Sequence, residues 1–189
     1  MRKVIISLHT TLDGFVAGPN GEMDWIKIDQ EIFDVVATFT DEADIALYGR
    51  VTYEMMENYW PTAADQPDAT KHDKEHSEWY NRVDKVVLSK TMQSNEINKL
   101  TVLSGNIDNE IKKLKQQTGK NMLMFGSPSA AHSLMEHNLI DEYWLFINPV
   151  ILGQGIPVFA NIREQIRLKL LTTKVFACGV TGLHYSVER

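Results

Sequence analysis

The apolar residues of this chain gather in short runs, and segments with a helical repeat of apolar positions lie between these runs. Short apolar runs bounded by turn residues predict buried strands. We expect strands at Lys3–His9, Ile45–Tyr48, Lys85–Leu88, Asn121–Phe125 and Glu142–Asn148, with a weaker one at Leu100–Leu103.

The intervening segments predict helices. Ile32, Val35, Val36 and Phe39 recur at helical spacing, so an amphipathic helix is expected over Asp29–Glu42. Further helices are expected after Tyr48 through Met56, over Glu75–Val83, over Asp108–Gln117 and from Ser127 to Asn138. The polar stretch from Pro61 to Lys74 shows no clear pattern.

Two final runs, Leu168–Ala177 and Val180–Val187, meet at Gly179 and predict a hairpin. Strands that alternate with helices and end in a hairpin predict an α/β fold, with a twisted, mostly parallel sheet, flanking helices and an antiparallel C-terminal hairpin. Since neither a linker nor an internal repeat interrupts the pattern, we expect one domain over residues 1–189.

Charge and composition narrow the class of protein. With 19 Lys and Arg against 25 Asp and Glu, the chain is mildly acidic, which argues against a general nucleic-acid surface but allows a local cationic site. Its single cysteine, Cys178, excludes an intrachain disulfide framework and a cysteine-based metal site. The N-terminal apolar stretch is too short for a signal peptide and no run is long enough to cross a bilayer, so we expect a cytoplasmic protein.

Three expected strands end in residues that suit an anionic ligand. These ends are Gly49-Arg50-Val51-Thr52, Ser89-Lys90-Thr91 and Gly126-Ser127-Pro128-Ser129. Ligands of open α/β sheets bind beyond the carboxyl ends of the strands, where helix N-termini offer free N–H groups to anions. Three such ends indicate one ligand with several phosphates.

The side chains at these ends favour NADP(H). Arg50 and Thr52 can hold a phosphate together with backbone N–H groups, and Lys90 follows the next strand at a similar level. No carboxylate stands where it would bind a free ribose 2′-hydroxyl, which favours NADP over NAD. The alternative is that both cations are ordinary solvated residues at the ends of their elements.

The third end is the most specific of the three. Gly126 allows the backbone to pass close to a pyrophosphate, the Ser127 hydroxyl can cap the following helix, and Pro128 suits its first position. A plain strand-to-helix turn is the alternative. Neither a Gly-x-Gly-x-x-Gly motif nor a Walker loop is present, so a dinucleotide would not be held in the Rossmann manner.

These segments resemble the dihydrofolate reductase superfamily, in particular the branch that contains the reductase domain of riboflavin biosynthesis. The resemblance rests on Gly49–Tyr53, Val87–Thr91 and Phe125–Phe159, together with Ser7–Gly18 and Met23-Asp24-Trp25 near the N-terminus. It covers nearly the whole chain.

The resemblance implies a dihydrofolate-reductase-like, NADPH-dependent reductase that often forms a homodimer. Arg50 and Thr52, next to Gly49, would hold the adenosine 2′-phosphate, and Leu88, Ser89 and Lys90 would lie on the adenine side. Val16 and Ala17 would contact the nicotinamide, below a lid over Gly18–Trp25. The pyrophosphate would lie at Gly126, Ser127, Pro128, Ser129 and Ala130.

Some residues depart from the pattern of the riboflavin-pathway reductases. The Gly-Gly pair at the pyrophosphate turn is Gly126-Ser127, and Phe15 and Phe125 replace a lysine and an acid. Both phenylalanines remove polar contacts to a phosphorylated, sugar-bearing pyrimidine. We therefore expect a small heteroaromatic or imine-like substrate of the pteridine or pyrimidine class, contacted by Phe15, Trp25, Tyr53 and Trp60.

Two carboxylates are candidates for the proton donor. Asp29 follows the loop tryptophan but suits the N-cap of the next helix equally well, and Asp13 can be a turn residue paired with Gly14. Water is a third source of the proton.

Two other functions remain open from the sequence. The fold can serve as a non-catalytic NADP(H)-binding or sensor module. The segment His72-Asp73-Lys74-Glu75-His76 matches the pattern of an inverted zinc protease, with His72 and His76 as ligands and Glu75 as base, although a solvated charge run explains the same residues. We expect the reductase, without a metal.

Overall fold

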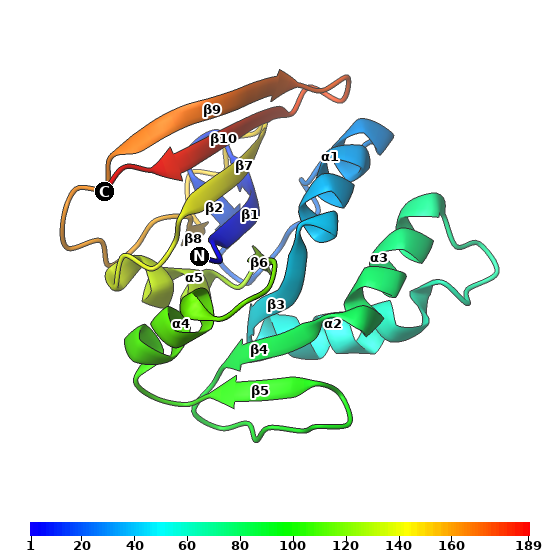
Figure 1. Ribbon diagram of the computed structural model, residues 1–189. Helices are drawn as coiled ribbons and strands as arrows, with labels where there is room; N and C mark the ends of the chain where they lie inside the picture. The colour runs from blue at the N-terminus through cyan, green and yellow to red at the C-terminus, as the bar shows by residue number, and fades with distance from the viewer.

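The computed structural model describes residues 1–189 and is built around an eight-stranded sheet with the order β5-β4-β3-β6-β1-β7-β10-β9 (Figure 1). Six neighbouring strands pair in parallel, and the last two pair antiparallel. The parallel strands are β1 (Val4–Thr11), β3 (Ala43–Gly49), β4 (Asp84–Leu88), β5 (Leu100–Leu103), β6 (Asn121–Phe125) and β7 (Glu142–Asn148). The predicted fold class is confirmed.

The C-terminal hairpin is confirmed as well. It consists of β9 (Leu168–Val175) and β10 (Thr181–Val187), and Gly179 in the turn has a φ of +88°. Glycine adopts such an angle without steric cost, which explains the break between the two apolar runs. A separate small sheet pairs β2 (Phe15–Ala17) with β8 (Ile156–Pro157).

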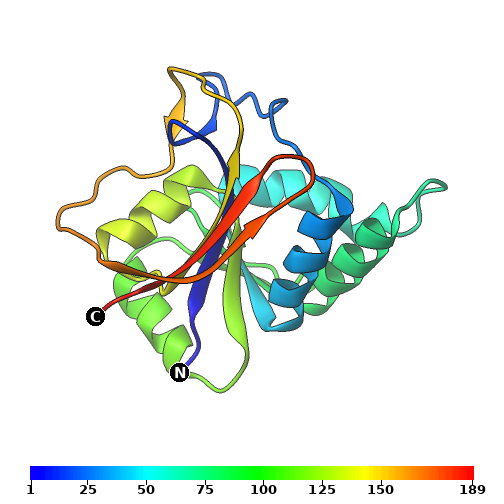
Figure 2. The same ribbon diagram turned by 90° about the horizontal axis from the view of Figure 1, so that it is seen from above.

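Helices cover both faces of the large sheet (Figure 2). One face carries α1 (Gln30–Asp41), α2 (Arg50–Ala63) and α3 (Lys71–Arg82), and the other carries α4 (Ile107–Gln116) and α5 (Pro128–Glu136). Because side chains alternate along a strand, β1 contributes Ile6 to the core under α4 and α5 and Ile5 to the core under α1 and α3. This two-sided burial explains the nearly continuous apolar runs.

Helix α3 begins at Lys71, four residues before the predicted start at Glu75. The Thr70 side chain accepts a hydrogen bond from the Asp73 backbone N–H, and the Asp73 carboxylate accepts one from the Thr70 backbone N–H. This capping box satisfies two groups that a helix start otherwise leaves unpaired. Its charged first turn hides the apolar repeat, which begins only at His76 and continues through Trp79 and Tyr80.

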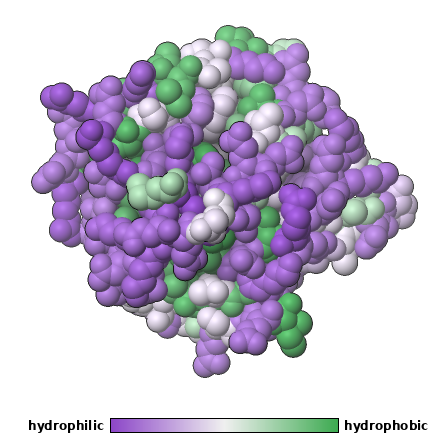
Figure 3. All heavy atoms as spheres, in the orientation of Figure 1, coloured by the Kyte–Doolittle hydropathy of each residue, from purple (hydrophilic) through white to green (hydrophobic).

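Hydrophilic residues cover most of the face shown in Figure 3, with apolar residues between them in small groups. None of the helices combines the length and the apolar character that crossing a membrane requires.

Candidate cofactor site

The strand order places the three predicted ligand-binding ends next to one another. Strands β4, β3 and β6 are neighbours and run in parallel, with Gly49 opposite Leu88 and Leu47 opposite Met124. Their carboxyl ends therefore open on one edge of the sheet, from which α2 and α5 begin. An edge of this kind is where open α/β sheets bind ligands.

The ends of β3 and β6 are joined by a hydrogen bond. The Gly49 backbone N–H donates to the Ser127 hydroxyl oxygen at 2.8 Å, and both groups are buried. A Cβ on Gly49 would lie 3.4 Å from the Ala130 Cβ, an ordinary van der Waals contact, so the start of α2 lies close to the start of α5. The prediction that the Ser127 hydroxyl caps α5 is wrong, because this hydroxyl reaches the neighbouring strand end instead.

The turn between β6 and α5 has an unusual backbone. Gly126 has a φ of +65° and Ser127 a φ of +60°, so two consecutive residues are left-handed. Pro128 occupies the first helical position, as predicted. The next N–H groups, of Ser129 and Ala130, belong to the first helical turn and have no intrahelical acceptor. These N–H groups and the helix dipole suit an anion.

Arg50 begins α2 beside this turn, and its guanidinium is half exposed. It donates to both Glu54 carboxylate oxygens, at 3.0 and 2.9 Å. A phosphate bound here would have to share the guanidinium with Glu54. Thr52 is half-buried and lies near the turn, since its Cγ2 is 3.9 Å from the position a Cβ would take on Gly126.

The third end, after β4, forms a compact loop. The Ser89 hydroxyl accepts hydrogen bonds from the backbone N–H groups of Thr91 and Met92, both at 3.2 Å. Lys90 is exposed and Leu88 is half-buried. Lys90 is thus free to approach a ligand, whereas the Ser89 side chain holds the loop.

The first loop is tied to the segment after β7. The Asp13 carboxylate accepts hydrogen bonds from the Thr11 hydroxyl at 2.6 Å and from the backbone N–H groups of Leu152 and Gly153 at 3.2 and 2.7 Å. The Thr11 hydroxyl is the main reason that the pKa of Asp13 lies below its usual range. A carboxylate held in this way is a poor proton donor.

Val16 and Ala17 follow in β2, and both are buried. Ala17 pairs with Ile156 of β8. A Cβ on Gly155 would lie 2.3 Å from the Ala17 carbonyl oxygen, so this close approach requires glycine. Phe15, at the start of β2, is half-buried.

Asp29 is the N-cap of α1, one of the two roles left open by the sequence. Its carboxylate accepts from the backbone N–H of Ile32 at 2.9 Å and from that of Cys178 at 3.2 Å. Desolvation alone would raise the pKa of Asp29, but the N–H donors, with Ile32 the largest, lower it overall. Trp25, in the preceding loop, donates its indole N–H to the Glu22 carbonyl oxygen at 3.2 Å.

The sequence motifs do not indicate a specific role for His9. This β1 side chain stacks on Phe146 with 5.0 Å between ring centroids, and its Nδ1 lies 3.3 Å from the Asn148 amide nitrogen. Burial lowers the pKa of His9 to about 4, so the ring is neutral at pH 7. The Asn148 amide oxygen also accepts from the Lys27 backbone N–H at 2.8 Å and thereby ties the segment before α1 to β7. The burial of His9 could have been predicted from strand alternation, because His9 and Ile5 lie on the same face of β1.

The aromatic residues predicted to contact substrate come from two parts of the chain. Phe15 and Trp25 belong to the N-terminal segment described above, and Tyr53 and Trp60 belong to α2. Tyr53 is only 5% exposed and packs in the core below α2. Trp60 is half-buried and contacts His76, with 4.0 Å between ring centroids.

The zinc hypothesis is not supported by the geometry. No three His, Cys, Asp or Glu side chains are placed to hold a metal ion. The His72 ring stacks on Phe33 at 3.8 Å, and the Glu75 carboxylate lies 3.6 Å from the Lys71 ammonium. His72 and His76 are four residues apart and therefore lie on the same face of α3. This face packs inward, where both rings contact aromatic side chains.

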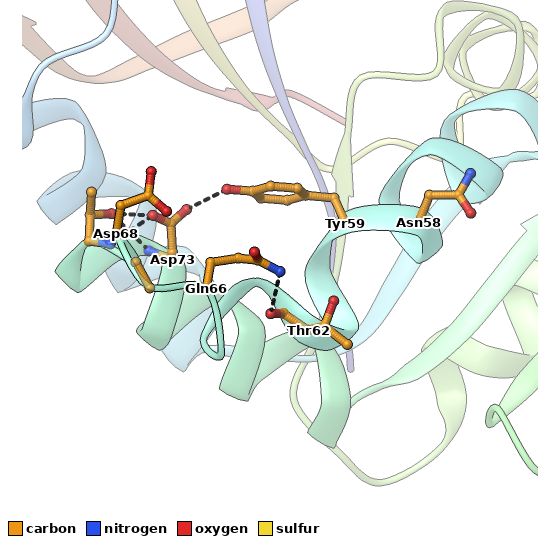
Figure 4. A pocket seen from close by; sticks show the side chains of 8 residues that line it. Asn58, Tyr59, Thr62, Gln66, Asp68 and Asp73 are labelled. Atoms are coloured by element: carbon orange, nitrogen blue, oxygen red, sulfur yellow. Dashed lines mark hydrogen bonds between the residues drawn. The ribbon is translucent and has the colours of Figure 1, made fainter.

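A cavity of about 460 Å³ lies away from the strand ends (Figure 4). It is formed by the end of α2, the loop that follows it and the start of α3. Within it the Tyr59 hydroxyl donates to Asp73 at 3.0 Å. None of the residues that line this cavity lies at the three strand ends, so it is not the site predicted from the sequence.

Comparison with known proteins decides the family. Residues 2–181 match the family described as the RibD C-terminal domain. The chain belongs to this family. The RibD C-terminal domain family thus accounts for the resemblance found in the sequence motifs and for the sheet topology.

Relatives cover the chain almost completely. The Bacillus subtilis (strain 168) protein named Uncharacterized protein YyaP is 36% identical over 97% of this chain and 94% of its own length. A putative riboflavin biosynthesis protein from Shewanella sp. PV-4 has a similar structure, with a TM-score of 0.73, 22% identity and 99% of each chain covered. These matches support the RibD C-terminal fold along nearly all of this chain.

A protein from Thermotoga maritima shares the fold as well. It is described as a diaminohydroxyphosphoribosylaminopyrimidine deaminase and 5-amino-6-(5-phosphoribosylamino)uracil reductase. The TM-score is 0.66 at 14% identity, and the match covers 99% of this chain and 57% of the other. At this identity the comparison shows the shared RibD C-terminal fold alone.

Proposed function

We propose that this protein is an NADPH-dependent reductase that transfers a hydride to a small heteroaromatic or imine-like compound. The observation that carries the proposal is the joined start of α2 and α5, where the Gly49–Ser127 hydrogen bond brings two helix N-termini to one edge of the sheet. Membership of the RibD C-terminal domain family, which includes reductases, supports the same conclusion.

The residues present suit the anionic part of NADPH. Around Gly126 no atom lies closer than 3.9 Å to the position a Cβ would take, so the backbone is open to a pyrophosphate there. N–H groups of a helix start, a guanidinium and an ammonium are all donors that phosphates prefer. Arg50, Thr52 and Lys90 would hold the 2′-phosphate and adenine side, with Leu88 and Ser89 beneath it.

NADPH, when bound, supplies the hydride, so the protein contributes orientation and exclusion of water. The buried Val16 and Ala17 would support the nicotinamide, and the Gly18–Trp25 loop would cover it. Since Asp13 and Asp29 both accept backbone hydrogen bonds, we assign the proton that completes the reduction to water rather than to either carboxylate. In the proposal the protein is cytoplasmic and acts as a homodimer.

The test has two parts. Calorimetry with NADPH and NADH should show binding of NADPH with the lower Kd, and loss of NADPH absorbance with a panel of pterins, pyrimidines and cyclic imines should reveal turnover. Absence of NADPH binding at millimolar concentration would refute the cofactor site.

A non-catalytic NADP(H)-binding or sensor module is the second candidate. The observation in its favour is that neither candidate acid is free to donate a proton. This candidate predicts NADPH binding with no consumption of NADPH by any member of the panel. The two proposals therefore differ in the turnover measurement and agree in the binding measurement.

A further inference from the structure

Six side chains form a continuous wall beside the proposed cofactor site. We call them the aromatic wall: Phe33, Met56, Trp60, His72, His76 and Phe125. Phe33 stacks on His72 with 3.8 Å between ring centroids, and Trp60 approaches His76 to 4.0 Å. The Trp60 indole nitrogen lies 3.0 Å from the Met56 sulfur. The wall thus joins α1, α2 and α3 through ring contacts.

One end of the aromatic wall adjoins the pyrophosphate turn. The Phe125 ring lies 5.3 Å from that of His76, and Phe125 directly precedes Gly126. The other end, Phe33, belongs to α1, whose N-cap is Asp29. The aromatic wall therefore extends from the pyrophosphate turn to the first turn of α1.

The histidines of the aromatic wall are uncharged at neutral pH. Burial lowers the pKa of His76 to about 3, with a smaller contribution from His72, and burial also lowers the pKa of His72. Rings that are neutral and stacked act as flat, weakly polar surfaces. They offer no countercharge to a phosphate.

The charged groups around the aromatic wall either pair with other side chains or point away from it. The Lys71 ammonium lies 3.9 Å from Asp34 and 3.6 Å from Glu75, and the Asp73 carboxylate belongs to the capping box. Lys74 and Glu78 are exposed and lie on the outer face of α3. A phosphate brought against the aromatic wall would lose its hydration without gaining a cation, which is costly.

We infer that the aromatic wall selects a planar, uncharged ring that carries no phosphate group as the compound reduced at this site. The inference rests on the proposed NADPH-dependent function. In the reaction a hydride from NADPH adds to an electrophilic ring carbon, the double bond to nitrogen becomes a single bond, water protonates the nitrogen, and NADP⁺ and hydroxide are left.

His76 adds one specific feature to this surface. Its Nδ1 is buried and has no hydrogen-bond partner, although the side chain is enclosed by Trp60, Trp79 and Phe125. A buried polar atom without a partner costs free energy. A ligand nitrogen that reached this atom would supply the missing hydrogen bond, which favours heterocycles over hydrocarbons.

The inference is tested with matched pairs of compounds that differ only in a phosphate. Riboflavin is compared with flavin mononucleotide, and 5-amino-6-ribitylaminouracil with its 5′-phosphate, by calorimetry on the full chain in the presence of NADP⁺. We expect at least one dephosphorylated compound to bind about tenfold more tightly than its phosphate. If in every pair the phosphate binds equally well or better, the inference is wrong.

Two variants separate a local effect from a general one. Met56→Lys places an ammonium beside Trp60, and we expect it to improve the affinity for the phosphorylated compounds about fivefold or more. Leu170→Lys, which adds the same charge on half-exposed β9, should leave both affinities unchanged. Equal gains in both variants would contradict a role of the wall.

A third variant keeps the inference testable if Met56→Lys does not fold. Trp60→Leu keeps an apolar side chain but removes the ring, and it should weaken binding of the dephosphorylated compounds about tenfold. Unchanged affinity in this variant, with an intact thermal transition, would also overturn the inference. NADPH titrated alone tests the proposed function separately, because the aromatic wall does not contribute to the phosphate contacts.

Discussion

The Gly49 backbone N–H donates a 2.8 Å hydrogen bond to the Ser127 hydroxyl, across 78 positions of sequence. This bond joins the ends of two parallel strands at the point where each gives way to a helix. Gly49 and Ser127 are both candidates for phosphate contacts. The hydrogen bond between them therefore fixes the two proposed phosphate-binding segments relative to each other. Ser127 accepts this hydrogen bond while in a left-handed conformation.

Ser127→Ala should loosen this turn. The variant leaves the buried Gly49 N–H without a partner, which costs about 1–3 kcal/mol of unfolding free energy. We expect NADPH affinity to fall about tenfold as the two helix starts separate. Urea unfolding and calorimetry measure the two effects. Ser133→Ala, which removes a hydroxyl that donates to the Ser129 carbonyl on the same helix, is the control and should change neither quantity appreciably.

Arg50 and Glu54 should tune the preference for the phosphorylated coenzyme. Arg50→Gln is expected to weaken NADPH about tenfold and NADH much less, because only NADPH has the 2′-phosphate. Glu54→Gln releases the guanidinium from its carboxylate partner and should strengthen NADPH binding severalfold. Equal losses for both coenzymes in Arg50→Gln would place Arg50 outside the 2′-phosphate site.

Two substitutions of Asp29 distinguish a helix cap from an acid. Asp29→Asn keeps an acceptor for the Ile32 N–H and cannot release a proton, so stability and turnover should stay close to those of the parent. Asp29→Ala removes the cap and should lower the unfolding free energy by about 1 kcal/mol. A large loss of kcat in Asp29→Asn, with unchanged thermal stability, would instead identify Asp29 as the proton donor.

The pH dependence of Asp29 has a definite sign. Because its pKa is lower in the folded state than in the unfolded state, its contribution is present above the unfolded pKa and is lost as the pH falls through the folded value. The acid limb of the stability profile should therefore be shallower in Asp29→Asn than in the parent.

His76 should make the protein sensitive to mild acid. Its folded pKa of about 3 lies below the ordinary value of 6.5, so the unfolded chain binds a proton that the folded chain does not. This linkage lowers the unfolding free energy by at most about 2 kcal/mol between pH 7 and pH 5. His76→Phe should flatten the stability profile in that range, as measured by urea unfolding at each pH. The groups that face the ring, His72 and Asp73, remain in the variant. An unchanged profile would show that the His76 ring protonates without unfolding.

Most elements of the fold were predictable because their signals are local. The apolar period of Ile32, Val36 and Phe39 and the capping residue Asp29 together define α1 to within a residue at each end. The start of α3 was missed, because its first turn is held by the Thr70–Asp73 capping box rather than by apolar contacts. A charged first turn has no apolar period to detect.

By itself, the sequence determined most of the strand ends and helix starts, apart from the start of α3, since glycine, proline and capping side chains act on their immediate neighbours. Only the tertiary structure decided that the Ser127 hydroxyl accepts a hydrogen bond from the Gly49 N–H, and that His72 and His76 contact aromatic rings rather than a metal. These partners come from other elements, and their proximity depends on strand order and helix packing. Spacing along the chain carries no information about either.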